Sequence, residues 1–132
     1  MTLGTFIRQL LVGDAGVAAL AGGRVYSEVL PQHGTVPAVV FSVVAGDSDA
    51  DLEGPTGVGS RRVQVDSWAG TRAEATALSL AVRALLDGYS GGAAGLDVQA
   101  VFHLTERWDF EAETKLFRTS QDYEVWTGGV EA

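Results

Sequence analysis

The residue pattern most capable of chemistry is a run of four acids at alternate positions: Asp47, Asp49, Asp51 and Glu53. Hard cations bind several oxygen ligands, and the three aspartates fit positions 1, 3 and 5 of a calcium loop. Position 6 of such a loop requires glycine but holds Leu52, and position 12 requires glutamate but holds Val58. Two interpretations therefore stay open, a cation site and a solvated acidic hairpin tip, and the pattern favours the second.

Two histidines, His33 and His103, could serve a Ser-His-Asp arrangement, and they are the only histidines in the chain. No Gly-x-Ser-x-Gly segment exists to present a nucleophile. The glycine-rich residues 88–95 lack the Gly-Lys-Ser/Thr of a phosphate loop and follow a predicted helix, whereas a phosphate loop follows a strand. The chain has no cysteine, so thiolate chemistry is excluded. We predict that the protein is not an enzyme and uses no cofactor or metal.

Arginine and tryptophan side chains give a different signal, because these residue types carry much of the energy of protein–protein interfaces. Those on predicted strands, together with one aspartate, are Arg61, Arg62, Asp66, Trp68, Trp108 and Trp126. The competing interpretation is that the tryptophans pack in the core while the arginines face solvent. We predict a subunit interface at Arg61, Arg62, Asp66 and Trp68.

The elements that must position these residues centre on residues 60–88. Residues 60–68 alternate in polarity, which predicts a strand with one wet or partner-facing side. Thr71 and Glu74 form a capping-box pattern at the start of a helix over residues 71–87, and Gly88 follows its end. The helix has one apolar stripe, and other strands must pack on this strand–helix pair.

The rest of the chain predicts two short helices over residues 3–11 and 14–20 and a short strand at residues 24–27. An apolar strand at residues 38–45 forms a long hairpin with residues 61–68, with residues 46–59 as its tip. Further strands are predicted at residues 98–104 and 116–126, separated by a charged segment at residues 106–113. The predicted fold class is a single α+β domain over residues 1–132, with a mostly antiparallel sheet of four to five strands and helices on one face.

The overall charge limits the possible partners. The 132-residue chain has a formal net charge of −8, and nine Lys and Arg residues spread along it do not form an obvious DNA-binding face. No apolar run reaches about 18 residues, so we predict no transmembrane helix and no membrane partner. The N-terminus also lacks the basic and small-residue features of a signal peptide.

Taken in order, short motifs over most of the chain resemble the small tail-completion, or tail-terminator, family of long-tailed bacteriophages and gene transfer agents. The motifs lie at residues 17–20, 23–26, 30–32, 37–41, 62–68, 73–75, 116–119 and 122–126, the last being Asp122-Tyr123-Glu124-Val125-Trp126. Each motif alone is weak, and their order and spacing carry the resemblance.

The resemblance implies a structural ring subunit, usually hexameric, on the head-proximal end of a tail tube in a virion or phage-like particle assembled in the host bacterial cytoplasm. Its partners would be other copies of itself, the tail tube protein and the head–tail connector protein, with DNA passing through the bore without specific binding. Acidic walls would repel DNA phosphates, so we predict that Asp47, Asp49, Asp51 and Glu53 face the lumen. The alternative function is a small-ligand or cation-binding α+β module that uses residues 47–53.

Overall fold

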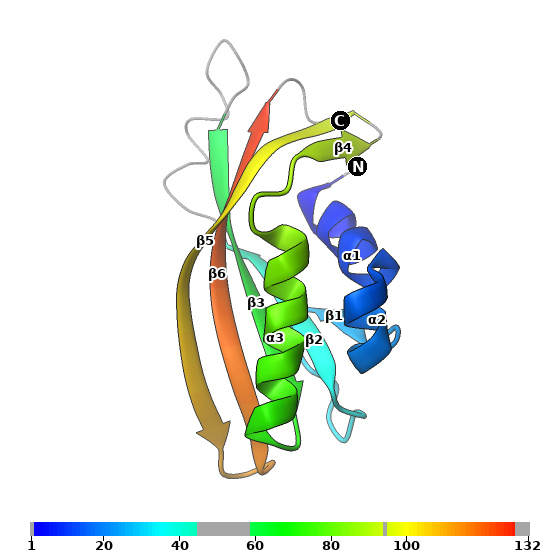
Figure 1. Cartoon of the computed structure of the whole chain (residues 1–132), viewed down its shortest axis with the longest axis vertical. Helices are drawn as coiled ribbons and strands as arrows, with labels where there is room; N and C mark the ends of the chain where they lie inside the picture. The colour runs from blue at the N-terminus through cyan, green and yellow to red at the C-terminus, as the bar shows by residue number, and fades with distance from the viewer. Residues whose placement is uncertain (1, 45–58, 94, 129–132) are drawn as a thin grey trace.

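Three helices and six strands make up the part of the chain that the computed structural model describes, residues 2–44, 59–93 and 95–128 (Figure 1). In chain order they are α1 (Leu3–Gly13), α2 (Ala15–Ala21), β1 (Val25–Ser27), β2 (Ala38–Val44), β3 (Gly59–Ala69), α3 (Arg72–Leu86), β4 (Gly91–Ala93), β5 (Leu96–Glu111) and β6 (Leu116–Gly128). All three helices lie on one side of the sheet. The α+β class and the one-sided helical layer are confirmed.

The strands form one sheet in the order β1-β2-β3-β6-β5-β4. Strand β1 runs parallel to β2, and every other neighbouring pair is antiparallel. The sheet thus has six strands where four to five were predicted. The additional strand is β4, which pairs with the start of β5 inside a segment that we predicted to be a glycine-rich link.

The predicted hairpin is confirmed in its pairing, because β2 and β3 are antiparallel neighbours from Ala38 opposite Trp68 to Val44 opposite Arg62. Of its predicted tip, residues 46–59, all but Gly59 lies outside the described residues. A longer hairpin joins β5 and β6, and the predicted charged segment forms the outer end of β5. Its charges hid the strand in the sequence: Trp108 and Phe110 alternate with Arg107, Asp109 and Glu111, but this end is not buried on either face.

The helix boundaries follow from their caps. The Thr71 hydroxyl oxygen accepts a hydrogen bond from the Glu74 backbone N–H at 3.1 Å, as the capping-box pattern predicts. The return bond differs from the standard box, because the Glu74 carboxylate accepts from the Thr71 hydroxyl at 3.0 Å. Thr2 and Asp14 cap α1 and α2 in the same way. After α3, Gly88 takes a φ of 83°, which glycine adopts without steric cost.

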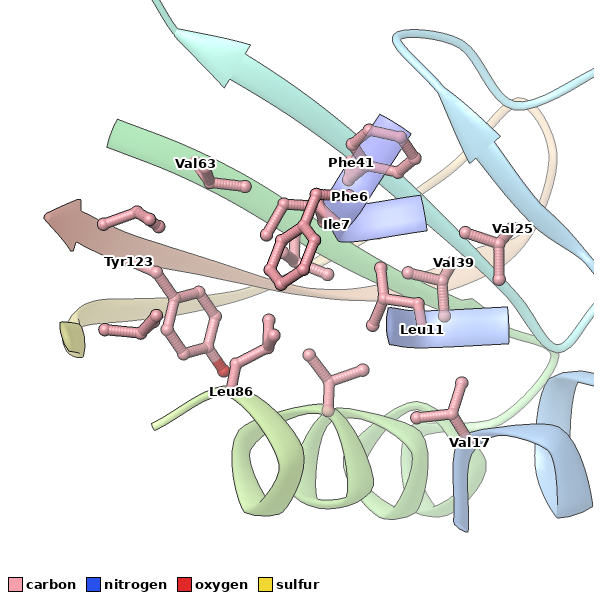
Figure 2. Packing of buried hydrophobic residues seen from close by; sticks show 14 of the residues in the cluster. Phe6, Ile7, Leu11, Val17, Val25, Val39, Phe41, Val63, Leu86 and Tyr123 are labelled. Atoms are coloured by element: carbon pink, nitrogen blue, oxygen red, sulfur yellow. The ribbon is translucent and has the colours of Figure 1, made fainter. Parts of the chain in front are cut away.

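The core lies between the helices and one face of the sheet (Figure 2). Helix α1 contributes Phe6, Ile7 and Leu11 to this core, and α3 contributes Leu78, Val82 and Leu86. The sheet contributes Val39, Phe41, Val63, Val65 and Tyr123. Each large apolar side chain buried in this way contributes about 1.5–3 kcal/mol. The apolar stripe of α3 that the sequence predicted is the part of the helix that is buried.

Among the described helices, no single one is long and apolar enough to cross a membrane. The bent pair α1 and α2 meets the length and composition criteria together, and the buried residues of both helices belong to the core just described.

Candidate functional site

The four predicted interface residues lie on two faces of β3. Side chains alternate along a strand, so Arg62, Asp66 and Trp68 lie on the face without helices. Arg61 belongs to the row of Val63, which faces the helices, and it is partly buried. Arg62 is exposed, whereas Asp66 and Trp68 each retain only 8% of their accessible surface. The structure therefore brings Asp66 and Trp68 together and separates Arg61 from them.

Arg118 of β6 explains why Asp66 and Trp68 are buried on a face that no helix covers. Its guanidinium donates two hydrogen bonds to Asp109 of β5, one of them from Nε to Oδ1 at 3.0 Å. Arg118 Nη1 also lies 3.8 Å from Asp66 Oδ2, and its guanidinium carbon lies 5.2 Å from the Trp68 ring centroid. One arginine thus links three strands through two carboxylates and an indole. We call these four residues the Arg118 cluster.

A second group of paired polar side chains lies further along the same face, beyond the Arg118 cluster. Arg107 of β5 donates to the Ser120 hydroxyl at 3.3 Å and lies 3.6 Å from Asp122 of β6. The Thr105 hydroxyl donates to the same Asp122 carboxylate at 3.0 Å. Arg107 and Arg118 of this face are matched by carboxylates of the same subunit, and Arg62 lies opposite Glu124 in the β3–β6 register. The face therefore does not form the unpaired basic patch that binding to DNA phosphates requires.

A groove of about 830 Å³ borders the Arg118 cluster. Trp68, Asp66 and Arg118 line it together with two segments far apart in sequence, residues 28–34 and residues 111–116. Its titratable lining residues are Glu28, His33, Asp66, Glu111, Glu113 and Arg118. Since the one guanidinium already pairs with Asp66 and Asp109, the lining carries an excess of negative charge.

Neither histidine sits in a catalytic arrangement within the described part of the chain. His33 lies in the lining of the groove, whereas His103 packs edge-on against Tyr123 with ring centroids 5.4 Å apart. The Nε2 atom of His103 lies 3.7 Å from Glu106 Oε1, and neither imidazole hydrogen-bonds a serine among the described residues. No group of three His, Cys, Asp or Glu residues within these residues could hold a metal ion.

A buried polar network joins α3 to the sheet. The side-chain amide of Gln121 donates to the Ser79 carbonyl oxygen at 3.3 Å and to Glu106 Oε1 at 3.0 Å. Its carbonyl oxygen accepts from the Tyr123 hydroxyl at 3.0 Å, and burial raises the pKa of that hydroxyl. Trp108 Nε1 donates to the other oxygen of Glu106 at 2.9 Å. The network is structural in character, since each side chain provides a hydrogen-bond partner for another.

The Arg118 cluster predicts a dependence of stability on acid. The Arg118 hydrogen bond holds the pKa of Asp109 below its ordinary value of 3.8, although burial opposes that shift. A lowered folded-state pKa stabilises the protein above the unfolded pKa, and the stabilisation is lost as the pH falls through the folded-state pKa. Asp109→Asn should therefore be less stable than wild type at about pH 6, and the difference should shrink below about pH 4.

Urea unfolding across this pH series measures the effect. Glu113→Gln changes a nearby exposed carboxylate by the same charge and serves as the matched control. A stability difference for Asp109→Asn that stays constant from pH 6 to the acid limit would contradict the role given to the Arg118 pair.

The outer end of the β5–β6 hairpin holds residues that the sequence analysis did not assign to a site. Arg72 of α3 donates to the Asp109 carbonyl oxygen at 2.8 Å and to the Thr119 hydroxyl at 3.0 Å. Its guanidinium carbon lies 6.0 Å from the Trp108 ring centroid and 5.3 Å from that of Phe117. Trp108 is nevertheless 64% exposed. The sequence signal available was the pair of aromatic residues at 108 and 110 inside a charged segment.

The predicted lumen-facing residues, Asp47, Asp49, Asp51 and Glu53, lie outside the described residues. Their role stays a prediction from charge alone.

Comparison with known proteins supports the family that the motifs resemble. A chain of a solved structure titled "Virion of native gene transfer agent (GTA) particle" shares the fold, with a TM-score of 0.67 and 24% sequence identity over 93% of this chain and 92% of that one. No curated protein matches the chain. The family model described as "Tail completion protein gp17" matches residues 5–128, which include α2, α3, most of α1, the whole described sheet and the Arg118 cluster. The chain therefore belongs to the Tail completion protein gp17 family.

Proposed function

We propose that this protein is a ring subunit, in a hexamer or a ring of similar size, that caps the head-proximal end of a phage-like tail tube. The ring ends tube growth and joins the tail to the head connector, and DNA passes through its bore. The observation that carries the proposal is family membership over residues 5–128. The protein acts as a component of the particle, by contact with its neighbours and without catalysing a reaction.

The electrostatics of the described surface support this function. A protein that lines a DNA passage must not hold the phosphates. On the helix-free face Arg107 and Arg118 are paired with carboxylates and Arg62 lies opposite Glu124, so no basic stripe forms there. The net charge of −8 adds repulsion, which favours sliding over binding.

The predicted subunit interface at Arg61, Arg62, Asp66 and Trp68 stays part of the proposal, with different roles for its members. Arg62 is exposed and available to a neighbour directly. Asp66 and Trp68 line the acidic groove, so they would act by shaping the surface that a neighbour meets. Arg61 lies in the other row of β3 and is partly buried, so only the exposed part of its side chain would contribute to the subunit interface.

Tube polymerisation in vitro tests the capping function. Purified tail tube protein that elongates from a tail tip should stop at a fixed length when this protein is added at one ring per tube. Tubes that reach the same lengths with and without the protein would refute the proposed capping function.

The lumen-facing role of Asp47, Asp49 and Asp51 gives a prediction about DNA exit. Changing all three residues to lysine replaces repulsion of DNA phosphates by attraction, so ejection from assembled particles should slow at low salt, where screening is weakest. The rates of variant and wild-type particles should converge as salt is raised. Equal ejection rates at low salt would exclude a position of these residues along the DNA path.

A further inference from the structure

The exposed apolar side chains of the described chain gather at two opposite edges of its sheet. Eight large apolar residues are exposed in that part of the chain: Leu20, Val29, Val44, Leu80, Phe102, Leu104, Trp108 and Phe110. Phe102, Leu104, Trp108 and Phe110 all belong to β5. Leu20, Val29 and Val44 lie on α2, directly after β1 and at the end of β2. Leu80 alone lies elsewhere, on α3.

Strand β5 is an edge strand over most of its length. Strand β4 pairs only with Leu96, Asp97 and Val98, and beyond them no described strand lies on that side of β5. The end of α3 covers the next part, where Gly88 N–H donates to the Val101 carbonyl oxygen and Asp87 accepts from the His103 N–H. Residues 105–111 then continue as an edge with which no described strand pairs on that side, although Arg72 of α3 donates to the Asp109 carbonyl oxygen there. A long edge strand that also exposes apolar side chains is a template for pairing with another chain.

The polar side chains of this edge already have partners inside the subunit. Glu106 accepts from Gln121 and Trp108, Arg107 pairs with Asp122, and Asp109 pairs with Arg118. The surface left for a neighbour therefore consists of backbone groups and exposed apolar side chains, with Phe102 on the helix-free face of β5 and Trp108 and Phe110 on the other face. Natural edge strands are commonly protected by proline, charged side chains or bulges. Strand β5 contains no proline or lysine, the charged side chains just named are paired within the subunit, and its two register shifts lie at Val98/Ala100 and His103/Thr105, before residues 105–111.

The opposite edge offers a surface of matching character. Strand β1 is short and covers β2 only from Val39 to Phe41, so the end of β2 that carries Val44 is also an edge. Val29, just beyond β1, is 70% exposed. In Figure 1 the two edges lie on opposite sides of the molecule, with β5 on the left and β1 and α2 on the right.

We propose that a second copy of this chain occupies the β5 edge, and that it contributes its β1–α2 edge to the contact. The two surfaces differ and belong to strands toward opposite ends of the sheet, although Val29 and Glu111 border the same groove, so each copy can use both at once. Repeated head-to-tail contacts of this kind close into a ring when the rotation allows it. This inference rests on the proposed ring and assigns the surfaces that hold it together.

Two variants separate the edges. Trp108→Lys places a charge on the β5 edge, Val29→Lys places one on the β1–α2 edge, and Leu80→Lys alters an equally exposed residue, 61% accessible, as the control. Native mass spectrometry should show rings for wild type and Leu80→Lys and monomers for each edge variant. An equimolar mixture of the two edge variants should form a one-to-one dimer, because one intact contact remains between them. Circular dichroism should show all variants folded.

Disulfide trapping gives a second readout, since the chain has no cysteine of its own. A Val29→Cys, Phe110→Cys double variant should give a ladder of covalent oligomers on oxidation, while each single variant should give none. A covalent dimer from Phe110→Cys alone would indicate that β5 pairs with β5, and it would overturn the proposal.

The remaining outcomes are equally decisive. Rings of Trp108→Lys that match those of Leu80→Lys would refute the edge assignment and leave the proposed function standing. If those rings also failed to bind tail tubes, the edge would belong to the tube contact, and the proposal would again be wrong. Wild-type protein that stays monomeric in solution and on tail tubes would overturn both the edge contact and the ring.

Discussion

Replacing Arg118 by methionine is expected to lower the free energy of unfolding by about 2 kcal/mol. Removing one partner of a buried ion pair costs about 3–5 kcal/mol, because the other charge stays buried without its counterion. Here the Arg118 side chain is 30% exposed and that of Asp66 is 12% exposed, so solvent reduces the cost. Asp66 also keeps its hydrogen bonds from the Gln64 amide at 3.1 and 3.3 Å.

Urea denaturation at pH 7 measures this loss, and Arg83→Met is the matched control. Arg83 pairs with Asp87 at 3.6 Å, but both side chains are well exposed, at 48% and 39%. Such surface pairs contribute about 0–1 kcal/mol. Equal, small losses for Arg118→Met and Arg83→Met would show that the Arg118 cluster does not hold the three strands together.

Gln121→Met is expected to cost about 2–3 kcal/mol, because it leaves buried polar groups unpaired at nearly constant side-chain volume. Both Gln121 and Tyr123 are fully buried. In the variant the Tyr123 hydroxyl loses its acceptor, and Glu106 loses one of its two donors. Differential scanning calorimetry and urea denaturation should agree on the loss.

A double-mutant cycle with Tyr123→Phe isolates the hydrogen bond between the two side chains. Gln121→Met leaves the Tyr123 hydroxyl without an acceptor, and Tyr123→Phe removes that hydroxyl. The loss of stability in the double variant should therefore be smaller than the sum of the two single losses, by about 1 kcal/mol. Strict additivity would mean that the loss in Gln121→Met arises from repacking alone.

The fold could be predicted from the sequence where one local rule decides the structure. The cap at Thr71, the glycine at 88 and the apolar stripe of α3 set that helix to within a residue at each end. The apolar run of β2 and the alternation of β3 likewise predicted a paired hairpin. Strand β4 was missed because Gly91 and Gly92 have low strand propensity, and its pairing depends on the neighbouring start of β5.

The site was less predictable, because it depends on pairing across strands distant in sequence. The alternation of β3 correctly placed Asp66 and Trp68 away from the helices, but Arg118 lies about fifty residues later and meets them only through the β3–β6 register. For the same reason the role of Arg72 could not be predicted, because its contacts with Trp108 and Phe117 require the start of α3 to lie near the start of β6. By contrast, the family could be identified from the sequence, because that identification depends on the order of short motifs along the chain and needs no knowledge of contacts between distant residues.

Electron microscopy of assembled tails that carry this protein tests the central claim most directly. Particles with a gold label or an added small domain at the C-terminus of this chain should show one ring of density per tail, at the head-proximal end, with an open bore. Label distributed along the tube or at the distal tip, or single copies without a ring at the head-proximal end, would contradict the proposed function.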